Sequence, residues 1–359
     1  MADTASAGGE IPRVEGDVEV IAASTSITLD EPICCAASSQ HLLREVIRTG
    51  FGVLDLKSSP RGTDMFAVAG SNGNLVFYFI QNINGVYLRE FCSIDLCRGS
   101  VIITYLDWVS TVGEKDKIAM ACSDGTLGVV HFDARDPSSC SSTSFVSIHI
   151  QQAWYVAWDG FDEQRLYSGG DDAHFCTFED PLIVLPRTNQ GRGPSDEAIA
   201  DFQPSVRDKR THTYGVTAIV PIGKGTDGES IVLTGSYDNR LRILRRRKAV
   251  LSWQTIAETD LGGGVWRISF LEHLTNIQEA LSTGVSFNIR LVASCMQDGP
   301  KIVEVGFEGD SNWSIRTLAR VPGHQLNYAT IAMPHQTDHG PRTLVSTDFT
   351  NRQAHVWRF

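Results

Sequence analysis

The stretch YSGGDDAHFCTFED (residues 167–180) follows a tyrosine and a serine with two glycines and two aspartates, then returns to apolar residues at every second position. Gly and Asp tolerate the tight backbone of a chain reversal, so the stretch predicts two antiparallel strands and the turn that joins them. Asp172 falls at the turn itself. Asp171, the additional acid before it, is less easily explained by the turn and is a candidate for a chemical role.

The same pattern recurs along the chain as an apolar strand, small residues, a polar turn and a second alternating strand. Each copy carries one Asn or Asp at its turn, and these residues are Asn72, Asp124, Asp172, Asp238, Asp298 and Asp348. Their spacing is slightly longer than the period of about 40 to 50 residues that marks propeller blades. Each copy has another strand candidate upstream, and several have a fourth downstream. Four strands per unit without helical periodicity predict an all-β fold, a β-propeller.

Six units follow residue 50, and the last ends at Phe359 without room for its fourth strand. The N-terminal segment is therefore expected to close the ring. It offers strand candidates at residues 18–29, 31–37 and 41–48, which form either a shortened seventh blade or only the closing strand. We predict seven blades.

One domain accounts for most of the chain. Residues 1–16 are expected to form a disordered tail, and residues 17–359 a single propeller domain. A polar stretch at about residues 186–210 is expected to be a mobile insertion between blades.

Composition and charge exclude several classes of function. The formal charge of −11 argues against general affinity for nucleic acid or anionic membrane. No signal peptide or membrane-spanning run is present, so a cytoplasmic protein is expected. The eight cysteines include no CxxC pair and the ten histidines no HxH or HExxH spacing, so we expect no metal and no cofactor. The basic cluster RRRK (residues 245–248) is interpreted as a solvated strand end, with a nuclear signal or a phosphate patch as alternatives.

Several motifs together resemble one family. AWYVAW with LYSGGDDAHF, HTYGVTAI with VLTGSYDNRLRIL, GGGVWRISF with LVASCMQDGPKI, and finally LNYATIA are similar, in this order, to the diphthine methylesterase family of WD-repeat proteins. The resemblance covers about residues 45–359, and the combination of SGGDD, TGSYD and GGGVWRI is far more specific than a generic propeller match. The Trp-Asp dipeptide that usually ends the third strand is missing, since FCTFED and LRILRRRK stand there. This departure concerns blade stability.

The resemblance implies a WD-repeat-like propeller and a reaction in diphthamide biosynthesis. That reaction is hydrolysis of the methyl ester of methylated diphthine, a modified histidine of elongation factor 2, which releases methanol and diphthine. Elongation factor 2 would be the protein substrate, with no direct binding of nucleic acid or membrane. The alternative is a non-catalytic scaffold for protein–protein interaction, the commonest role of a propeller. The three shared motifs favour the esterase.

Ester hydrolysis needs an attacking oxygen, a base and donors for the oxyanion. The chain has no GxSxG motif, and Cys295 follows an apolar run typical of a core, so the nucleophile stays open between a bound water and a covalent intermediate. His212 in RTHTYGV is a candidate base near neutral pH, although a histidine at this place in a blade often hydrogen-bonds a turn aspartate instead. Asp171 is the second catalytic candidate.

Diphthine carries a trimethylammonium group, which aromatic faces and carboxylates recognise best. The substrate-binding candidates share a place at the start of a blade's first strand: Trp154, Tyr214, Trp266 and Tyr328. Arg267 is a candidate for binding a carboxylate or oxyanion, and glycines 262–264 would let the backbone approach a ligand closely. Packing between blades and an ordinary salt bridge are the competing interpretations. We expect His212 and Asp171 at the same end of the channel as Trp266 and Arg267.

Overall fold

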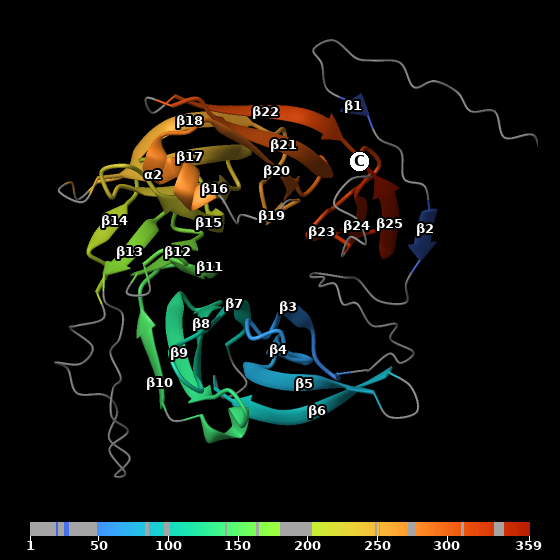
Figure 1. Cartoon of the computed structure of the whole chain (residues 1–359). Helices are drawn as coiled ribbons and strands as arrows, with labels where there is room; N and C mark the ends of the chain where they lie inside the picture. Colours follow the sequence, from blue (N-terminus) through green and yellow to red (C-terminus); the bar gives the residue numbers. More distant parts are fainter. Residues whose placement is uncertain are drawn as a thin grey trace, which may run out of the picture.

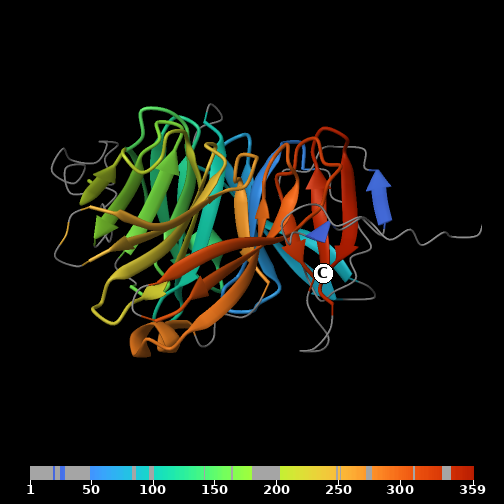
Figure 2. The ribbon, with the colours of Figure 1, turned by 90° about the horizontal axis from the view of Figure 1, so that it is seen from above.

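A computed structural model of the chain describes residues 19–20, 25–28, 49–82, 86–96, 101–140, 142–162, 165–179, 203–247, 250, 252–271, 277–309, 312–333 and 341–359. Six sheets in this part of the chain, antiparallel except for one short N-terminal strand, stand around a central axis, and Figure 1 looks along that axis. Figure 2 shows the same ribbon turned by 90°, with the sheets standing side by side. The fold is therefore the predicted β-propeller, and we number its blades one to six in chain order.

The first three blades each use four consecutive strands, and the first strand of each is the innermost. The first blade comprises β3 (Val53–Ser58), β4 (Met65–Gly70), β5 (Asn74–Asn82) and β6 (Val86–Asp95). The second comprises β7 (Ile103–Ser110), β8 (Lys115–Cys122), β9 (Thr126–Asp133) and β10 (Ser142–Ser147), with the short 3-10 helix η1 (Pro137–Ser139) before β10. The third comprises β11 (Ala153–Trp158), β12 (Arg165–Gly170), β13 (Phe175–Glu179) and β14 (Val206–Asp208).

The remaining blades repeat this order. The fourth comprises β15 (Val216–Lys224), β16 (Ser230–Ser236), β17 (Arg240–Arg246) and β18 (Gln254–Asp260). The fifth comprises β19 (Arg267–Phe270), β20 (Phe287–Ser294), β21 (Pro300–Phe307) and β22 (Trp313–Arg320), with helix α2 (Ile277–Thr283) between its first two strands. The sixth comprises β23 (Thr330–Ala332), β24 (Thr343–Asp348) and β25 (Gln353–Arg358).

Two N-terminal strands complete the outer edges of the last two blades. Strand β2 (Thr25–Thr28) pairs antiparallel with β25 and gives the sixth blade its fourth strand. Strand β1 (Glu19–Val20) adds in parallel to β22. The N-terminal segment thus supplies a closing strand, because β25 otherwise leaves an unpaired edge.

The predicted number of seven blades is wrong for the described residues, which form six sheets. Strand β2 fills the open edge of the sixth blade instead of starting a sheet of its own. The other N-terminal strand candidates, at residues 31–37 and 41–48, and the tail at 1–16 lie outside the described residues.

Two further expectations need correction. The predicted insertion at 186–210 overlaps β14, whose three residues pair with β13 as the outermost strand of the third blade, while residues 186–202 lie outside the described part. Helix α2 was not expected, and it packs beside β15 through the buried side chains of Ile277 and Leu281. Among the described residues, no helix has the length and apolar character that crossing a membrane requires.

The second strands of the second, third and fourth blades are buried along nearly their whole length. Strands β12 and β16 are buried at every position, and β8 at every position but its first. A sheet packed against neighbours on both faces has no polar side, so its strands read as continuous apolar and small residues. This packing holds the innermost strands in place around the axis.

Candidate functional site

Trp154 and Trp266 occupy equivalent places at the start of the innermost strands of the third and fifth blades, Trp154 within β11 and Trp266 directly before β19. The carbonyl oxygen of the preceding residue, Ala153 or Val265, accepts a hydrogen bond of 2.5 Å from a threonine hydroxyl of the blade before it. A β-bulge displaces Trp154 from the ladder, and a bulge re-aims a side chain. The two indole rings meet edge to face, with centroids 5.2 Å apart.

Trp266 lies at the centre of four aromatic rings. Its ring centroid is 5.0 Å from that of Tyr328 in the sixth blade and 5.8 Å from that of Tyr237 in the fourth. Its side chain is buried, whereas the other three rings are half-buried. We call Trp154, Tyr237, Trp266 and Tyr328 the aromatic cluster. Three of its four members, Trp154, Trp266 and Tyr328, are among the substrate-binding candidates predicted from the sequence.

Asp171 lies directly against this cluster. The indole Nε1 of Trp154 donates a hydrogen bond of 2.5 Å to Asp171 Oδ1. Burial raises the pKa of Asp171, partly opposed by that hydrogen bond. The negative charge of Asp171 also contributes to the raised pKa of Tyr237, after burial itself. A carboxylate among ring faces is the arrangement that attracts a bulky cation.

Tyr237 was missed in the sequence, although a signal for it exists. The N–H of Tyr237 donates to the carbonyl of Gly215, just as the N–H of Asp171 donates to that of Gln152. The two residues therefore hold the same turn position in successive blades, each directly before the repeated aspartate. Aligning the turns SGGDD and TGSYD residue by residue would have paired Asp171 with Tyr237.

Two other expectations do not fit the cluster. Tyr214 is 65% exposed and makes no ring contact with another described residue. Gly263 packs against the carbonyl oxygen of Cys295, where a Cβ atom would collide, so at this position the triple glycine serves packing within the blade. Cys295 is buried, and burial raises its pKa to about 12, which makes it a poor nucleophile.

His212 belongs to a repeated structural network. Its Nε2 shares a hydrogen bond of 2.9 Å with Thr234 Oγ1, as His149 does with Ser168 and His324 with Ser346, both at 2.8 Å. In the third blade the other nitrogen of the histidine also bonds Asp172 at 2.9 Å, whereas in the fourth blade the turn aspartate pairs with an arginine instead.

The environment of His212 argues against a catalytic role. Its side chain is buried, and burial, reinforced by the charge of Arg242, lowers its pKa to about 4. A base of this pKa is weak near neutral pH. The imidazole is enclosed between Phe175 of the third blade and Thr234 of the fourth, and none of its contacts with described residues joins it to Asp171 or Trp266.

A central cavity is lined by the residues that directly follow Trp154 and Trp266 in the innermost strands. Arg267 follows Trp266, Tyr155 follows Trp154, and Tyr105 holds the corresponding place in β7. These three residues line a cavity of about 100 Å³ together with Asp55 and Lys57 from β3. Its chemistry is polar and partly charged, and it lies directly beneath the aromatic cluster, since Tyr328 borders both.

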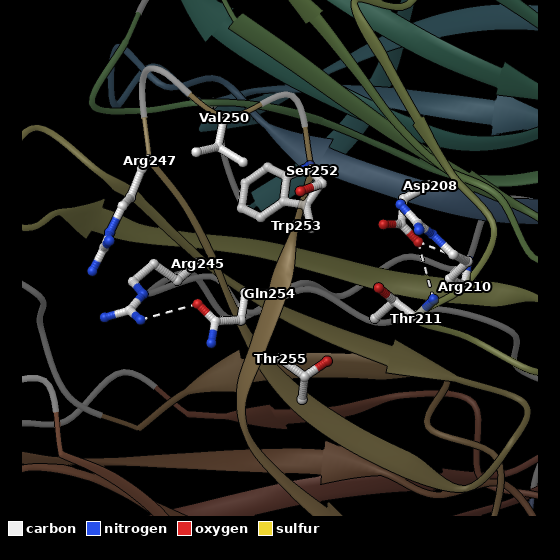
Figure 3. Close-up of a pocket in the computed structure, with 10 residues that line it drawn as sticks. All are labelled: Asp208, Arg210, Thr211, Arg245, Arg247, Val250, Ser252, Trp253, Gln254 and Thr255. Atoms are coloured by element: carbon white, nitrogen blue, oxygen red, sulfur yellow. Dashed lines mark hydrogen bonds between the residues drawn. The ribbon is translucent and has the colours of Figure 1, made fainter.

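A second hollow lies at the outer edge of the fourth blade, near β14, β17 and β18 (Figure 3). It contains Trp253 and two residues of the basic cluster, Arg245 and Arg247. Arg245 donates to Gln254 at 3.0 Å, and both arginines lie within 4 Å of Glu229. Only Arg247 matches the expected solvated strand end, because Arg246 is buried and pairs with Glu179, and the Arg245 side chain is largely enclosed. Among the described residues no group of three His, Cys, Asp or Glu side chains could hold a metal ion.

Comparison with known proteins found relatives in several eukaryotes, while no protein-family model matches the chain. The diphthine methyltransferase homolog of Dictyostelium discoideum is 26% identical over 276 residues, which cover 76% of this chain and 66% of that protein. The diphthine methyltransferase of Schizosaccharomyces pombe is 27% identical, covering 64% and 60%, and that of Saccharomyces cerevisiae 23%, covering 85% and 82%. The chain thus spans less than two thirds of the length of the first two.

Among solved structures, the crystal structure of Saccharomyces cerevisiae Sqt1 matches with a TM-score of 0.51 and 11% identity. The match covers 86% of this chain and 72% of that chain, and at such identity it supports the fold alone. The chain is thus similar in sequence to proteins named diphthine methyltransferase, at 23 to 27% identity over 64 to 85% of its length.

Proposed function

We propose that this chain hydrolyses the methyl ester of methylated diphthine on elongation factor 2 and releases methanol and diphthine. The similarity to these relatives supports a substrate of the diphthine type, because the relatives carry that word in their names. The motif resemblance supports ester hydrolysis. We place the activity in the cytoplasm, with elongation factor 2 as the protein partner.

The observation that carries the proposal is the aromatic cluster with Asp171 beside it. A trimethylammonium group has no hydrogen to donate, so a protein recognises it through ring faces and nearby negative charge. Trp154 combines both features, since its ring meets Trp266 and its indole N–H holds the Asp171 carboxylate.

The reaction can be assigned to residues on the two sides of Trp266. A water molecule attacks the ester carbonyl, the bond from the carbonyl carbon to the methoxy oxygen breaks, and a proton passes to the departing methoxide. We assign Asp171 the role of the base that takes the proton from water, since its raised pKa moves it toward the operating pH. We assign Arg267 the role of stabilising the oxyanion.

The names of the relatives describe transfer of a methyl group, whereas our proposal describes its removal. Intact-mass spectrometry separates the two. Purified chain is incubated with elongation factor 2 that carries methylated diphthine, and our proposal expects the loss of one methylene's mass. A gain of that mass in the presence of a methyl donor would support transfer, and no change with a folded preparation would support the scaffold alternative.

A further inference from the structure

Within the described part of the chain, Arg267 is a cation without an ion-pair partner. Its hydrogen bonds go to the main-chain carbonyls of Thr217 (3.2 Å) and Trp266 (2.9 Å), and no carboxylate among the described residues lies within ion-pair distance. The guanidinium carbon lies 4.7 Å from the ring centroid of Trp266 and 4.6 Å from that of Tyr105. A half-buried guanidinium that faces a cavity retains donors for an anionic group.

The hydroxyl groups of Tyr105 and Tyr155 supply a further donor. Their oxygens are 2.6 Å apart, and their rings stack with centroids at 3.8 Å. Burial raises the pKa of both phenols, so both remain protonated. Two O–H groups share one hydrogen bond, and neither oxygen has another hydrogen-bond partner among the described residues. One O–H is therefore free to donate to a ligand in the cavity.

The two other charged residues that line the cavity, Lys57 and Asp55, neutralise each other. Lys57 pairs with Asp55 at 2.9 Å, and Asp55 also accepts the N–H of Leu106 at 3.0 Å. Asp107, two residues beyond Tyr105, accepts the N–H of Trp158 at 2.6 Å, and burial raises its pKa to about 6. The net charge of these four groups is therefore +1, from Arg267, when Asp107 is protonated, and zero when Asp107 is ionised.

The opposite charge lies on the other side of the aromatic cluster. Asp171 bonds Trp154 and Arg267 stacks on Trp266, while these two indoles touch each other. Tyr237 lies near both charges. Burial is the main cause of its raised pKa, the charge of Asp171 raises this pKa further, and the charge of Arg267 lowers it. The site therefore has a negative outer end and a positive inner end, separated by little more than one aromatic side chain.

We infer that the aromatic cluster and the central cavity form one binding site for a dipolar ligand, a quaternary ammonium whose neighbouring carbon carries a carboxylate or its ester. The ammonium lies against the cluster on the Asp171 side. The carbonyl oxygens point inward to Arg267 and the free hydroxyl of the Tyr105 and Tyr155 pair. The inference rests on the proposed function and adds the inner half of the site, which also holds the carboxylate of the product.

Calorimetric titration of the full chain with small probes tests the two halves separately. Trimethylglycine presents both groups, tetramethylammonium only the cation, and acetate only the anion. We expect trimethylglycine to bind most tightly. Arg267→Gln should weaken its binding by roughly tenfold or more, because a hydrogen bond to a charged group is lost, and should leave tetramethylammonium unaffected. Asp171→Asn should weaken the binding of both probes that carry the cation, trimethylglycine and tetramethylammonium.

Matched variants keep the test independent of folding. Arg316→Gln makes the same change on the outer strand β22, where the arginine pairs with Glu304, and should bind every probe like the parent. The double variant Tyr105→Phe with Tyr155→Phe keeps both rings and removes only the hydroxyls. It should weaken the binding of trimethylglycine and leave that of tetramethylammonium unchanged.

Two results would overturn the inference: trimethylglycine binding no more tightly than tetramethylammonium, or Arg267→Gln weakening both probes equally. The mass-spectrometric assay of ester hydrolysis is read separately. Hydrolysis without selective binding of trimethylglycine would reject the inner half of the site and leave the proposed function intact. Selective binding without hydrolysis would reject the reaction and retain the dipolar site.

Discussion

Replacing Trp266 with leucine removes the central ring of the aromatic cluster. Trp266 touches the rings of Trp154, Tyr237 and Tyr328, so no other single residue contributes contacts to every member. An aromatic face contributes on the order of 2 kcal/mol to a desolvated cation, which corresponds to roughly 30-fold weaker binding when it is lost. Leucine keeps much of the apolar bulk, and we expect a stability loss of about 1 to 3 kcal/mol from the smaller side chain.

The assay measures the affinity for tetramethylammonium and KM for the methylated substrate, each next to a thermal melt. Tyr214→Leu is the matched control, because Tyr214 is an exposed aromatic residue in the neighbouring loop and lies outside the cluster. Trp266→Leu should lower the affinity for tetramethylammonium and raise KM, while Tyr214→Leu should leave both unchanged. If Trp266→Leu is folded at the assay temperature and binds tetramethylammonium and turns over substrate at parental values, the cluster is not the cation site.

Three further changes test the other assigned roles. Asp171→Asn should lower kcat more than affinity and remove the acid limb of the pH–rate profile, whose pKa lies above that of an ordinary carboxyl group; steady-state kinetics across acid pH checks this. His212→Ala should cost about 1 to 3 kcal/mol of stability in urea melts yet leave that profile unchanged. Because the folded-state pKa of His212 is about 4 against 6.5 unfolded, its contribution to stability should be lost as pH falls from 6.5 toward 4. Burial raises the pKa of Asp172, but hydrogen bonds, first that from His149, lower it well below its ordinary value, so Asp172→Ala should destabilise at neutral pH and matter less in strong acid.

Much of the fold could be predicted because each blade repeats the same local chemistry. The turn residues Asp124, Asp172 and Asp238 stand between the second and third strands of three successive blades, as the repeat predicts. The number of blades could not be predicted in this way, because the partner of the N-terminal strand β2 is the edge of β25 at the other end of the chain. Nothing local in β2 identifies that edge.

The candidate site, like the fold, could be predicted from the sequence only in part. Asp171 stands out locally because it is an additional acid before the repeated aspartate, and Trp154 and Trp266 because each is an aromatic residue near the start of a blade's first strand. The hydroxyl pair of Tyr105 and Tyr155 does not, because the two residues are 50 positions apart and each reads as an ordinary strand residue. Only the closed ring of blades brings their side chains together.

The most direct test of the account is ester hydrolysis followed in water labelled with heavy oxygen. Elongation factor 2 with methylated diphthine is incubated with the purified parent chain, and the modified peptide is analysed by mass spectrometry. The account predicts that the methyl ester disappears, that methanol forms, and that the new carboxylate carries one labelled oxygen from water. A folded preparation that leaves the ester intact, or that removes the methyl group without introducing label, would contradict it.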